Sequence, residues 1–168
     1  MELSHKNSRS ILSAEEQVSQ GFTAWTYSME LLKKMHELHP NIIVKDGDQV
    51  IGYAMVALKQ AKSFHPELEV MINELDKLIY KGKPLCQYSY YVMGQICIAK
   101  EYRGKGIFEL LYNKHRELLS KQYEFLITEI PTINKRSIRA HEKVGFKTIH
   151  TYNDGKNEWN AVIWDWYR

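Results

Sequence analysis

Apolar residues in the first part of the chain recur at the spacing of an α-helix. Ser13 and Glu16 have the spacing of a capping box, which predicts a helix that begins near Ala14. Further along, one helical face is marked by Leu31, Leu32, Met35 and Leu38. This helical pattern must end before Pro40, because the residue before a proline is steered away from helical geometry.

Beyond Pro40 the pattern alternates between strands and helices. Strands are predicted at 41–45, 49–59, 88–99, 123–130, 146–152 and 158–166. Helices are predicted at 66–80, from residue 107 onward, and at 135–143. Gly94 interrupts the third strand as a bulge does, and Gly145 stands where a left-handed helix cap belongs. Because hairpins and helical crossovers both occur in this order, we expect an α/β fold with a mixed sheet.

Composition narrows the class of protein. With 168 residues, of which 44% are hydrophobic, the chain is predicted to form a single domain over residues 1–168. No apolar run approaches the roughly 20 residues that span a bilayer, and residues 1–10 lack a signal-peptide core, so no membrane partner is expected. Cys86 and Cys97 form neither a disulfide framework nor a metal-ligand spacing, which favours a cytoplasmic protein without a metal. A net charge of +3 without a basic stripe argues against a nucleic-acid partner.

The sharpest chemical signal is the run Arg103-Gly104-Lys105-Gly106-Ile107, which joins a predicted strand to a predicted helix. Glycine lets the backbone approach a ligand closely, and the free N–H groups at a helix start carry the positive end of the helix dipole. Such a corner binds phosphate or pyrophosphate. Taken alone, the run is equally consistent with a plain glycine turn beside solvated basic residues. A P-loop requires Ser or Thr where Ile107 stands, and the dinucleotide fingerprint requires a third glycine.

A second string runs from Asn134 to Phe146 and reads Asn-Lys-Arg-Ser-Ile-Arg-Ala-His-Glu-Lys-Val-Gly-Phe. In this order, and about thirty residues apart, the two strings together resemble the GNAT superfamily of N-acetyltransferases. Its members carry Arg/Gln-x-x-Gly-x-Gly/Ala at the strand-to-helix corner, then an Asn, a helix and a Gly-Phe ending. The resemblance covers residues 88–151 well. It implies a single GNAT-like domain with a mixed central sheet, flanked by helices and splayed at the cofactor strand.

The resemblance also implies acetyl-CoA as the acyl donor. The backbone amides that would hold its pyrophosphate belong to Arg103, Gly104, Lys105, Gly106, Ile107 and Phe108. Cys97 and Ile98 would pair their exposed backbone with the pantetheine arm, and Asn134 would contact the cofactor side of the cleft. Phe108 departs from the family pattern, which has Gly or Ala there. Its side chain either crowds the start of the helix or points into the core.

For catalysis, the resemblance implies direct attack of a primary amine on the thioester in a ternary complex, without an acyl-enzyme. Glu129, five residues before Asn134, matches a general base, and His141 stands where many members carry a tyrosine acid. An imidazole can donate a proton near neutral pH, so this exchange is compatible with the acid function. The alternatives are a sheet-edge or surface carboxylate for Glu129, and packing or cofactor contact for His141.

Other residues of the cofactor strand have two interpretations. Some of Tyr88, Tyr90, Tyr91 and Gln95 are expected to line the acceptor cleft, and the alternative is a tyrosine-rich sheet face. Cys97 as a covalent acyl carrier lacks a base beside it in the sequence.

The two ends of the chain carry expectations of their own. Family members open with a strand, but residues 1–12 show no clean alternation, so this segment is expected to be irregular or the chain to start later than the usual fold. An unpaired sheet edge invites covering by another chain, and the aromatic last strand offers a surface for a homodimer.

Two other functions stay open. One is a CoA-binding module that senses or regulates without turnover. The other is an RNA- or peptide-binding domain, which would show salt-dependent affinity for polyanions without CoA. The sequence does not identify the amine acceptor.

Overall fold

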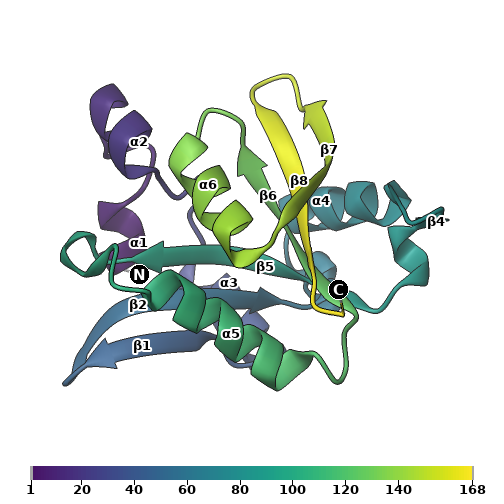
Figure 1. Ribbon diagram of the computed structural model, residues 1–168, viewed down its shortest axis with the longest axis horizontal. Coiled ribbons are helices and arrows are strands. Elements are labelled where there is room, and N and C mark those ends of the chain that lie inside the picture. Colours follow the sequence, from purple (N-terminus) through teal and green to yellow (C-terminus); the bar gives the residue numbers. More distant parts are fainter. Residues whose placement is uncertain (1, 168) are drawn as a thin grey trace.

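A mixed sheet forms the centre of the molecule (Figure 1), and the computed structural model describes residues 2–167. Its strands within that range are β1 (Ile42–Asp46), β2 (Gln49–Ala57), β5 (Tyr90–Ile98), β6 (Phe125–Pro131), β7 (Lys147–Asn153) and β8 (Glu158–Asp165). They lie in the order β1-β2-β5-β6-β8-β7, and all neighbours are antiparallel except β5 and β6, which run parallel. The predicted α/β fold with a mixed sheet is therefore confirmed.

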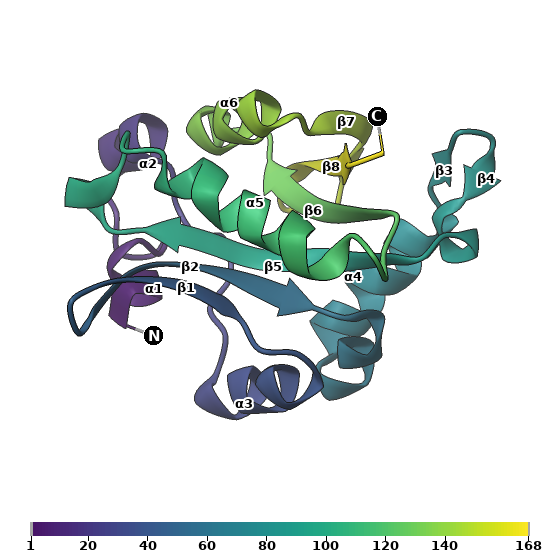
Figure 2. The same ribbon diagram turned by 60° about the horizontal axis from the view of Figure 1, so that its bottom comes forward.

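Helices cover both faces of this sheet. In the described chain they are α1 (Glu2–Lys6), α2 (Ala14–Gln20), α3 (Met29–Leu38), α4 (Pro66–Lys77), α5 (Ile107–Leu119) and α6 (Lys135–Val144). Figure 2 shows α5 and α6 on one face and α3 and α4 on the other. Because side chains alternate along a strand, Leu126 and Ile130 of β6 pack in the α5–α6 layer, whereas Phe125 and Ile127 pack in the α3–α4 layer. Neighbours on one strand therefore reach different layers.

The strands β5 and β6 separate along their length. Their parallel ladder has three residue pairs and ends at Val92 of β5. Just beyond, β5 carries the predicted bulge, since Gly94 and Gln95 together lie opposite Met55 of β2. The two strands then point apart (Figure 1), and no strand of the described chain pairs with the remainder of β5, up to Ile98, on its β6 side. The predicted splay at the cofactor strand is present.

The N-terminal segment, residues 2–27, lies across the open end of the sheet, beside β5 and α6 (Figure 1). Glu2–Lys6 form the helix α1, so the expectation of an irregular start is wrong there, and residue 1 lies outside the described range. Residues 2–12 form no strand, in agreement with their missing alternation. The helix α2 begins after a complete capping box of Ser13 and Glu16, as predicted, and ends at Gln20 with Gly21 as its C-cap.

Two other segments differ from the prediction. The helix expected over 66–80 ends at Lys77, because Ile79–Tyr80 (β3) pairs with Lys83–Pro84 (β4) in a small hairpin. The strand expected to reach residue 59 ends at Ala57, and a 3₁₀ helix, Lys59–Phe64, follows it.

Two findings concern the surface. Within residues 2–167, no helix combines the length and the apolar character needed to span a bilayer. Trp164 and Trp166, near the end of the chain, are buried in the α5–α6 layer. These two side chains therefore offer no exposed face to a second copy, whereas Trp159 of β8 is half-buried. The homodimer stays a prediction.

Candidate active site

The glycine corner joins the end of β5 to the start of α5. Gly104 and Gly106 have φ values of +75° and +78°, a left-handed region that residues with side chains rarely adopt. Gly106 is the N-cap of α5, and no side chain caps this helix end. The first N–H groups of α5 therefore lack a partner within the helix and have the positive end of its dipole behind them. This geometry suits an anion such as a phosphate group.

The corner opens onto a cleft of about 570 Å³ between β5, α5, α6 and the N-terminal segment. The predicted cofactor residues that line it are Cys97, Ile98, Arg103, Gly104, Gly106, Ile107, Phe108 and Asn134. Lys105 does not line it, and its ammonium group lies over the ring of Tyr102. The unpaired stretch of β5 and the glycine corner thus meet in one cleft, which fits a long ligand with a phosphate group part-way along it.

Asn134 ties the N-terminal segment to the rim of this cleft. It is the N-cap of α6: its Oδ1 accepts from the Ser137 N–H at 3.3 Å, and its Nδ2 donates to the Phe22 carbonyl at 3.0 Å. Gly21 permits the close approach, because a Cβ there would lie 2.9 Å from Asn134 Oδ1. The predicted cofactor contact of Asn134 is thus accompanied by a structural role that the sequence did not reveal.

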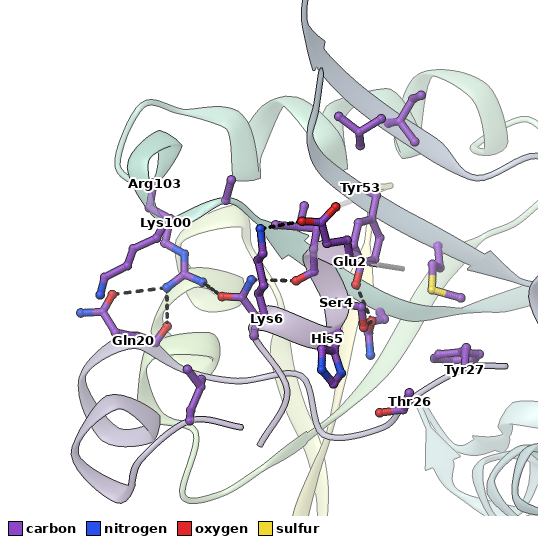
Figure 3. A pocket seen from close by; sticks show the side chains of 18 of the residues that line it. Glu2, Ser4, His5, Lys6, Gln20, Thr26, Tyr27, Tyr53, Lys100 and Arg103 are labelled. Atoms are coloured by element: carbon purple, nitrogen blue, oxygen red, sulfur yellow. Dashed lines mark hydrogen bonds and ion pairs between the residues drawn. The ribbon is translucent and has the colours of Figure 1, made fainter. Parts of the chain in front are cut away.

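Arg103 also bonds to the N-terminal segment, and Figure 3 shows its side chain beside Gln20. Its guanidinium group donates to the Gln20 carbonyl at 3.0 Å and to Asn7 Oδ1 at 2.6 Å. A third bond runs from Nε to the Ile98 carbonyl at 3.0 Å. The side chain of Arg103 therefore bonds to protein groups, so the predicted contact with the cofactor would come from its backbone N–H.

Three basic residues of α6 also line the cleft, and sequence reasoning missed them. Arg136, Arg139 and Lys143 lie three and four positions apart, which places them on one helical face. Arg136 donates to the Ser19 carbonyl at 3.0 Å, whereas Arg139 and Lys143 are exposed at the cleft. This spacing was a usable signal, since positive side chains that face a glycine corner favour bound phosphate.

His141 lies in the core between α5 and α6. Its Nδ1 donates to the Ser137 carbonyl at 2.8 Å, so its Nε2 accepts from the Tyr112 hydroxyl, at 2.6 Å. Burial lowers the pKa of this imidazole to about 4, which leaves the ring neutral at pH 7. The ring of Phe108 packs edge-on against it, with centroids 5.0 Å apart. Phe108 therefore points into the core, and the position of His141 supports the packing alternative.

Glu129 reaches the opposite face of the sheet. It follows Phe125 and Ile127 at alternate positions of β6, so its side chain lies in the layer covered by α3 and α4. This half-buried carboxyl group accepts a hydrogen bond from the Tyr152 hydroxyl at 2.7 Å. Burial raises the pKa of Glu129 to about 7, although the Tyr152 hydrogen bond acts in the lowering direction. Glu129 and His141 thus lie in different layers, and the structure does not bring them together.

The remaining candidates of β5 are mostly in the core. Tyr90 and Tyr91 are fully buried, one in each core layer, and Tyr88 packs partly buried in the α3–α4 layer. The amide of Gln95 is buried and bonded to the Ser4 and Tyr53 hydroxyls and to the Trp25 carbonyl. For these tyrosines the sheet-packing alternative describes the structure, and Gln95 holds the N-terminal segment on the bulge.

Cys97 lines the cleft, but its thiol is poorly suited to act as a nucleophile. Burial raises the pKa of its thiol to about 11, and its Sγ lies 3.8 Å from the Leu3 carbonyl. A thiol with this pKa holds almost no thiolate at neutral pH, so the structure gives no support to a covalent acyl carrier.

A second hollow, of about 1020 Å³, lies on the other side of the N-terminal segment (Figure 3). Its lining includes Tyr53 and Met55 of β2, together with residues of α1. Asn7, Gln20 and Arg103 line both hollows, so they form the partition between them. Side chains of both charge signs border the second hollow.

Comparisons with known proteins agree with this geometry. A family model described as Acetyltransferase (GNAT) family matches residues 9–146. One similar solved structure is Naa20 from Chaetomium thermophilum in complex with a bisubstrate analogue, at 16% identity over 86% of this chain and 76% of that chain, with a TM-score of 0.63. Another is the NatC complex bound to Gag peptide and CoA, at 13% identity over 90% and 87% of the two chains, with a TM-score of 0.61.

A third is the ribosomal-protein-S18-alanine N-acetyltransferase from Escherichia coli, at 13% identity over 94% and 89% of the chains, with a TM-score of 0.56. A search of curated protein sequences finds no match. At these identities the solved structures show a shared fold. The family model spans most of the chain, including the glycine corner and the helix after Asn134. The protein therefore belongs to the GNAT family of acetyltransferases.

Proposed function

We propose that the protein transfers an acetyl group from acetyl-CoA to a primary amine, with Glu129 as the general base. The observation that carries this proposal is the position of Glu129, two residues past the last β6 residue that pairs with β5. A carboxyl group there stands at the point where the two strands begin to separate. Its pKa of about 7 suits a group that must accept a proton near neutral pH.

Donor binding is supported by three features of the cleft. Uncapped N–H groups at the start of α5 suit the pyrophosphate of CoA, and Arg139 and Lys143 add positive charge nearby. The backbone of β5 beyond Val92 has no strand on its β6 side. Side chains already donate to the Met93, Gly94 and Ile98 carbonyls. The amides of the pantetheine arm would therefore pair with the other N–H and C=O groups of this stretch. Acetyl-CoA bound in this way supplies the thioester.

The acceptor enters as an ammonium ion, which has no lone pair for attack. Glu129 takes one proton from it, and the free amine then attacks the thioester carbonyl carbon. A C–N bond forms and the C–S bond breaks, and the second amine proton passes to the departing thiolate, directly or through water. A thiol pKa near ~8.5 makes this leaving group a modest base, so the step needs little help from an acid. A buried, neutral His141 is compatible with that requirement.

Direct transfer within a ternary complex is favoured over an acyl-enzyme. The cysteine that lines the cleft, Cys97, has a thiol pKa raised to about 11 by burial. Nucleophilic catalysis by cysteine depends on the thiolate, which such a pKa suppresses.

The acceptor itself is best sought by screening. Two structural neighbours are described with a bound peptide or as acting on a ribosomal-protein alanine. Peptides with free N-termini are therefore the first acceptors to test, followed by polyamines and amino acids. The rival function, a CoA-binding sensor without turnover, predicts CoA binding but no thiol release with any acceptor.

Glu129→Gln tests the proposed base. We expect turnover, followed as thiol release with an accepted amine, to fall by about 10²–10⁴-fold, because the amide cannot take a proton. The affinity for CoA is expected to equal that of the wild type, since Glu129 does not line the cleft beside the glycine corner. Glu117→Gln, at an exposed ion pair with Lys114 on α5, serves as the control and should keep the full rate. A Glu129→Gln protein with the wild-type rate and pH profile would place the base elsewhere.

A further inference from the structure

The carboxyl group of Glu129, on β6, contacts the side chain of Tyr152, which lies on β7 in the last hairpin of the chain. The strand β8 lies between β6 and β7. Glu129 pairs with Ala161 of β8, and Ala161 pairs with His150 of β7. Tyr152 follows two residues after His150 and so lies on the same face of the sheet. Because Ala161 carries only a methyl group, the Tyr152 ring has room to cross β8 and meet Glu129.

The contact between Tyr152 and Glu129 has a defined donor. Burial raises the pKa of the Tyr152 phenol above its ordinary value, so Tyr152 keeps its proton and donates it to Glu129 Oε1 at 2.7 Å. No other hydrogen bond to this carboxyl group occurs within residues 2–167. The second oxygen, Oε2, is therefore left without a protein donor in this part of the chain.

We propose that Tyr152 is a positioning residue for the catalytic base: it holds Oε1 of Glu129 and leaves Oε2 to receive the proton of the acceptor amine. The inference rests on the proposed role of Glu129 as the base. One hydrogen bond fixes the rotamer of a glutamate that would otherwise be free to turn. It also favours the charged form, which is the form that accepts a proton.

The other charges near Glu129 do not offer the same support. The charged and titratable groups that face Glu129 or Tyr152 are Asp154, Glu74, Tyr90 and His150, whose ring stacks on that of Tyr152 with centroids 6.1 Å apart. Behind Tyr90 lie Asp76, which accepts from its hydroxyl, and Lys59, which lies over its ring. Asp154, in the turn between β7 and β8, disfavours the charged form of Glu129 by repulsion. The ammonium group of Lys59 lies 2.6 Å from Asp76 and is paired with it, and His150 contacts the ring of Tyr152. Tyr152 is thus the neighbour that stabilises the Glu129 carboxylate.

Loss of the Tyr152 hydroxyl is expected to raise the pKa of Glu129. Without this donor the carboxylate of buried Glu129 is less favoured, so the group ionises at higher pH. The acidic limb of the rate profile should move upward by about one pH unit, as expected for loss of one charge-assisted hydrogen bond. Turnover at pH 7 should fall several-fold and recover at pH 9. A role in packing alone would lower the rate equally at both pH values.

The protein with ¹³C-labelled glutamate side chains allows a test that needs no acceptor. NMR titration should show one carboxyl resonance with a midpoint near pH 7, which the Glu129→Gln variant removes. In Tyr152→Phe that midpoint should rise by about one pH unit. Tyr80→Phe is the matched control, because Tyr80 also donates to a carboxylate, that of Asp165, at 3.0 Å. Its variant should leave the Glu129 midpoint unchanged.

The opposite shift comes from Asp154→Asn, which removes a negative charge near Glu129 and should lower the midpoint. This second variant is the positive control, because it shows that the assigned resonance responds to a change of charge near Glu129. Tyr152→Phe keeps the aromatic ring and removes the hydroxyl alone, so the packing of the folded protein is preserved. An unchanged Glu129 midpoint in Tyr152→Phe overturns the inference. The proposed function fails separately: if Tyr152→Phe shifts the midpoint but Glu129→Gln keeps full turnover, the contact stands and the base lies elsewhere.

Discussion

Replacing Gly106 with alanine tests the cofactor corner with the smallest possible side chain. Gly106 has φ +78° and ψ 1°, and an added Cβ would meet no protein atom within 4 Å. The substitution therefore strains the backbone without creating a clash inside the protein. Because Gly106 lines the cleft that we propose to hold CoA, the new methyl group would lie where the backbone must approach the ligand.

The expected magnitudes separate the two effects. A left-handed conformation costs an alanine about 1–2 kcal/mol, which for a protein of this size lowers the Tm by roughly 2–8 °C. One charge-assisted hydrogen bond to a phosphate is worth about 1.5–3 kcal/mol. If the methyl group displaces the pyrophosphate from one N–H group, CoA affinity should fall by about ten- to 150-fold.

The assay is calorimetric titration of CoA, paired with thermal unfolding of the same samples. Gly82→Ala is the matched control: Gly82 has φ +80°, an added Cβ would meet nothing within 4 Å, and it lies in the turn between β3 and β4. Both variants should lose a similar amount of stability, and only Gly106→Ala should lose CoA affinity. Equal CoA affinity in the two variants would refute the placement of the pyrophosphate at this corner.

His141→Phe is expected to leave the alkaline limb of the pH–rate profile in place and to lower stability at pH 7 by about 1–3 kcal/mol, because the buried Tyr112 hydroxyl loses its partner. Since the folded-state pKa of His141, about 4, lies below its ordinary 6.5, the folded state binds fewer protons and the protein loses stability as pH falls from 6.5 to 4. Urea unfolding at several pH values should show that the free energy of unfolding of the variant falls less between pH 6.5 and pH 4. A shift of the alkaline limb in His141→Phe would instead indicate that His141 is the general acid. Arg139→Gln and Lys143→Gln should each weaken CoA binding by up to about fivefold and reduce its salt dependence, with Arg116→Gln on α5 as the control. An unaltered salt dependence would remove both side chains from the phosphate site.

Much of the fold follows from interactions between residues that are close in the chain. The Ser13–Glu16 capping box, the bulge at Gly94 and the left-handed cap at Gly145 all occur where the sequence places them. Each depends on backbone geometry and hydrogen bonds within a few residues, so local pattern is sufficient to predict it. The glycine corner belongs to the same class, because strand, turn and helix are contiguous there.

The wall of the cleft required the tertiary structure. Asn134 bonds to the Phe22 carbonyl across 112 positions of the chain, and no local pattern marks either partner for the other. The predicted end of one helix was wrong for a related reason. The helix expected over 66–80 ends at Lys77, because Ile79–Tyr80 pairs with Lys83–Pro84 in a hairpin.

The chemistry of the two catalytic candidates was likewise decided by packing. Spacing along the sequence marked Glu129 and His141 equally well, but strand alternation sends Glu129 into the α3–α4 layer while α6 buries His141 in the other. A pKa depends on burial and on the donors that surround a group, and these come from distant segments. The hydroxyl that holds Glu129 belongs to Tyr152, 23 positions away and two strands across the sheet, where only the folded chain brings it within hydrogen-bonding distance.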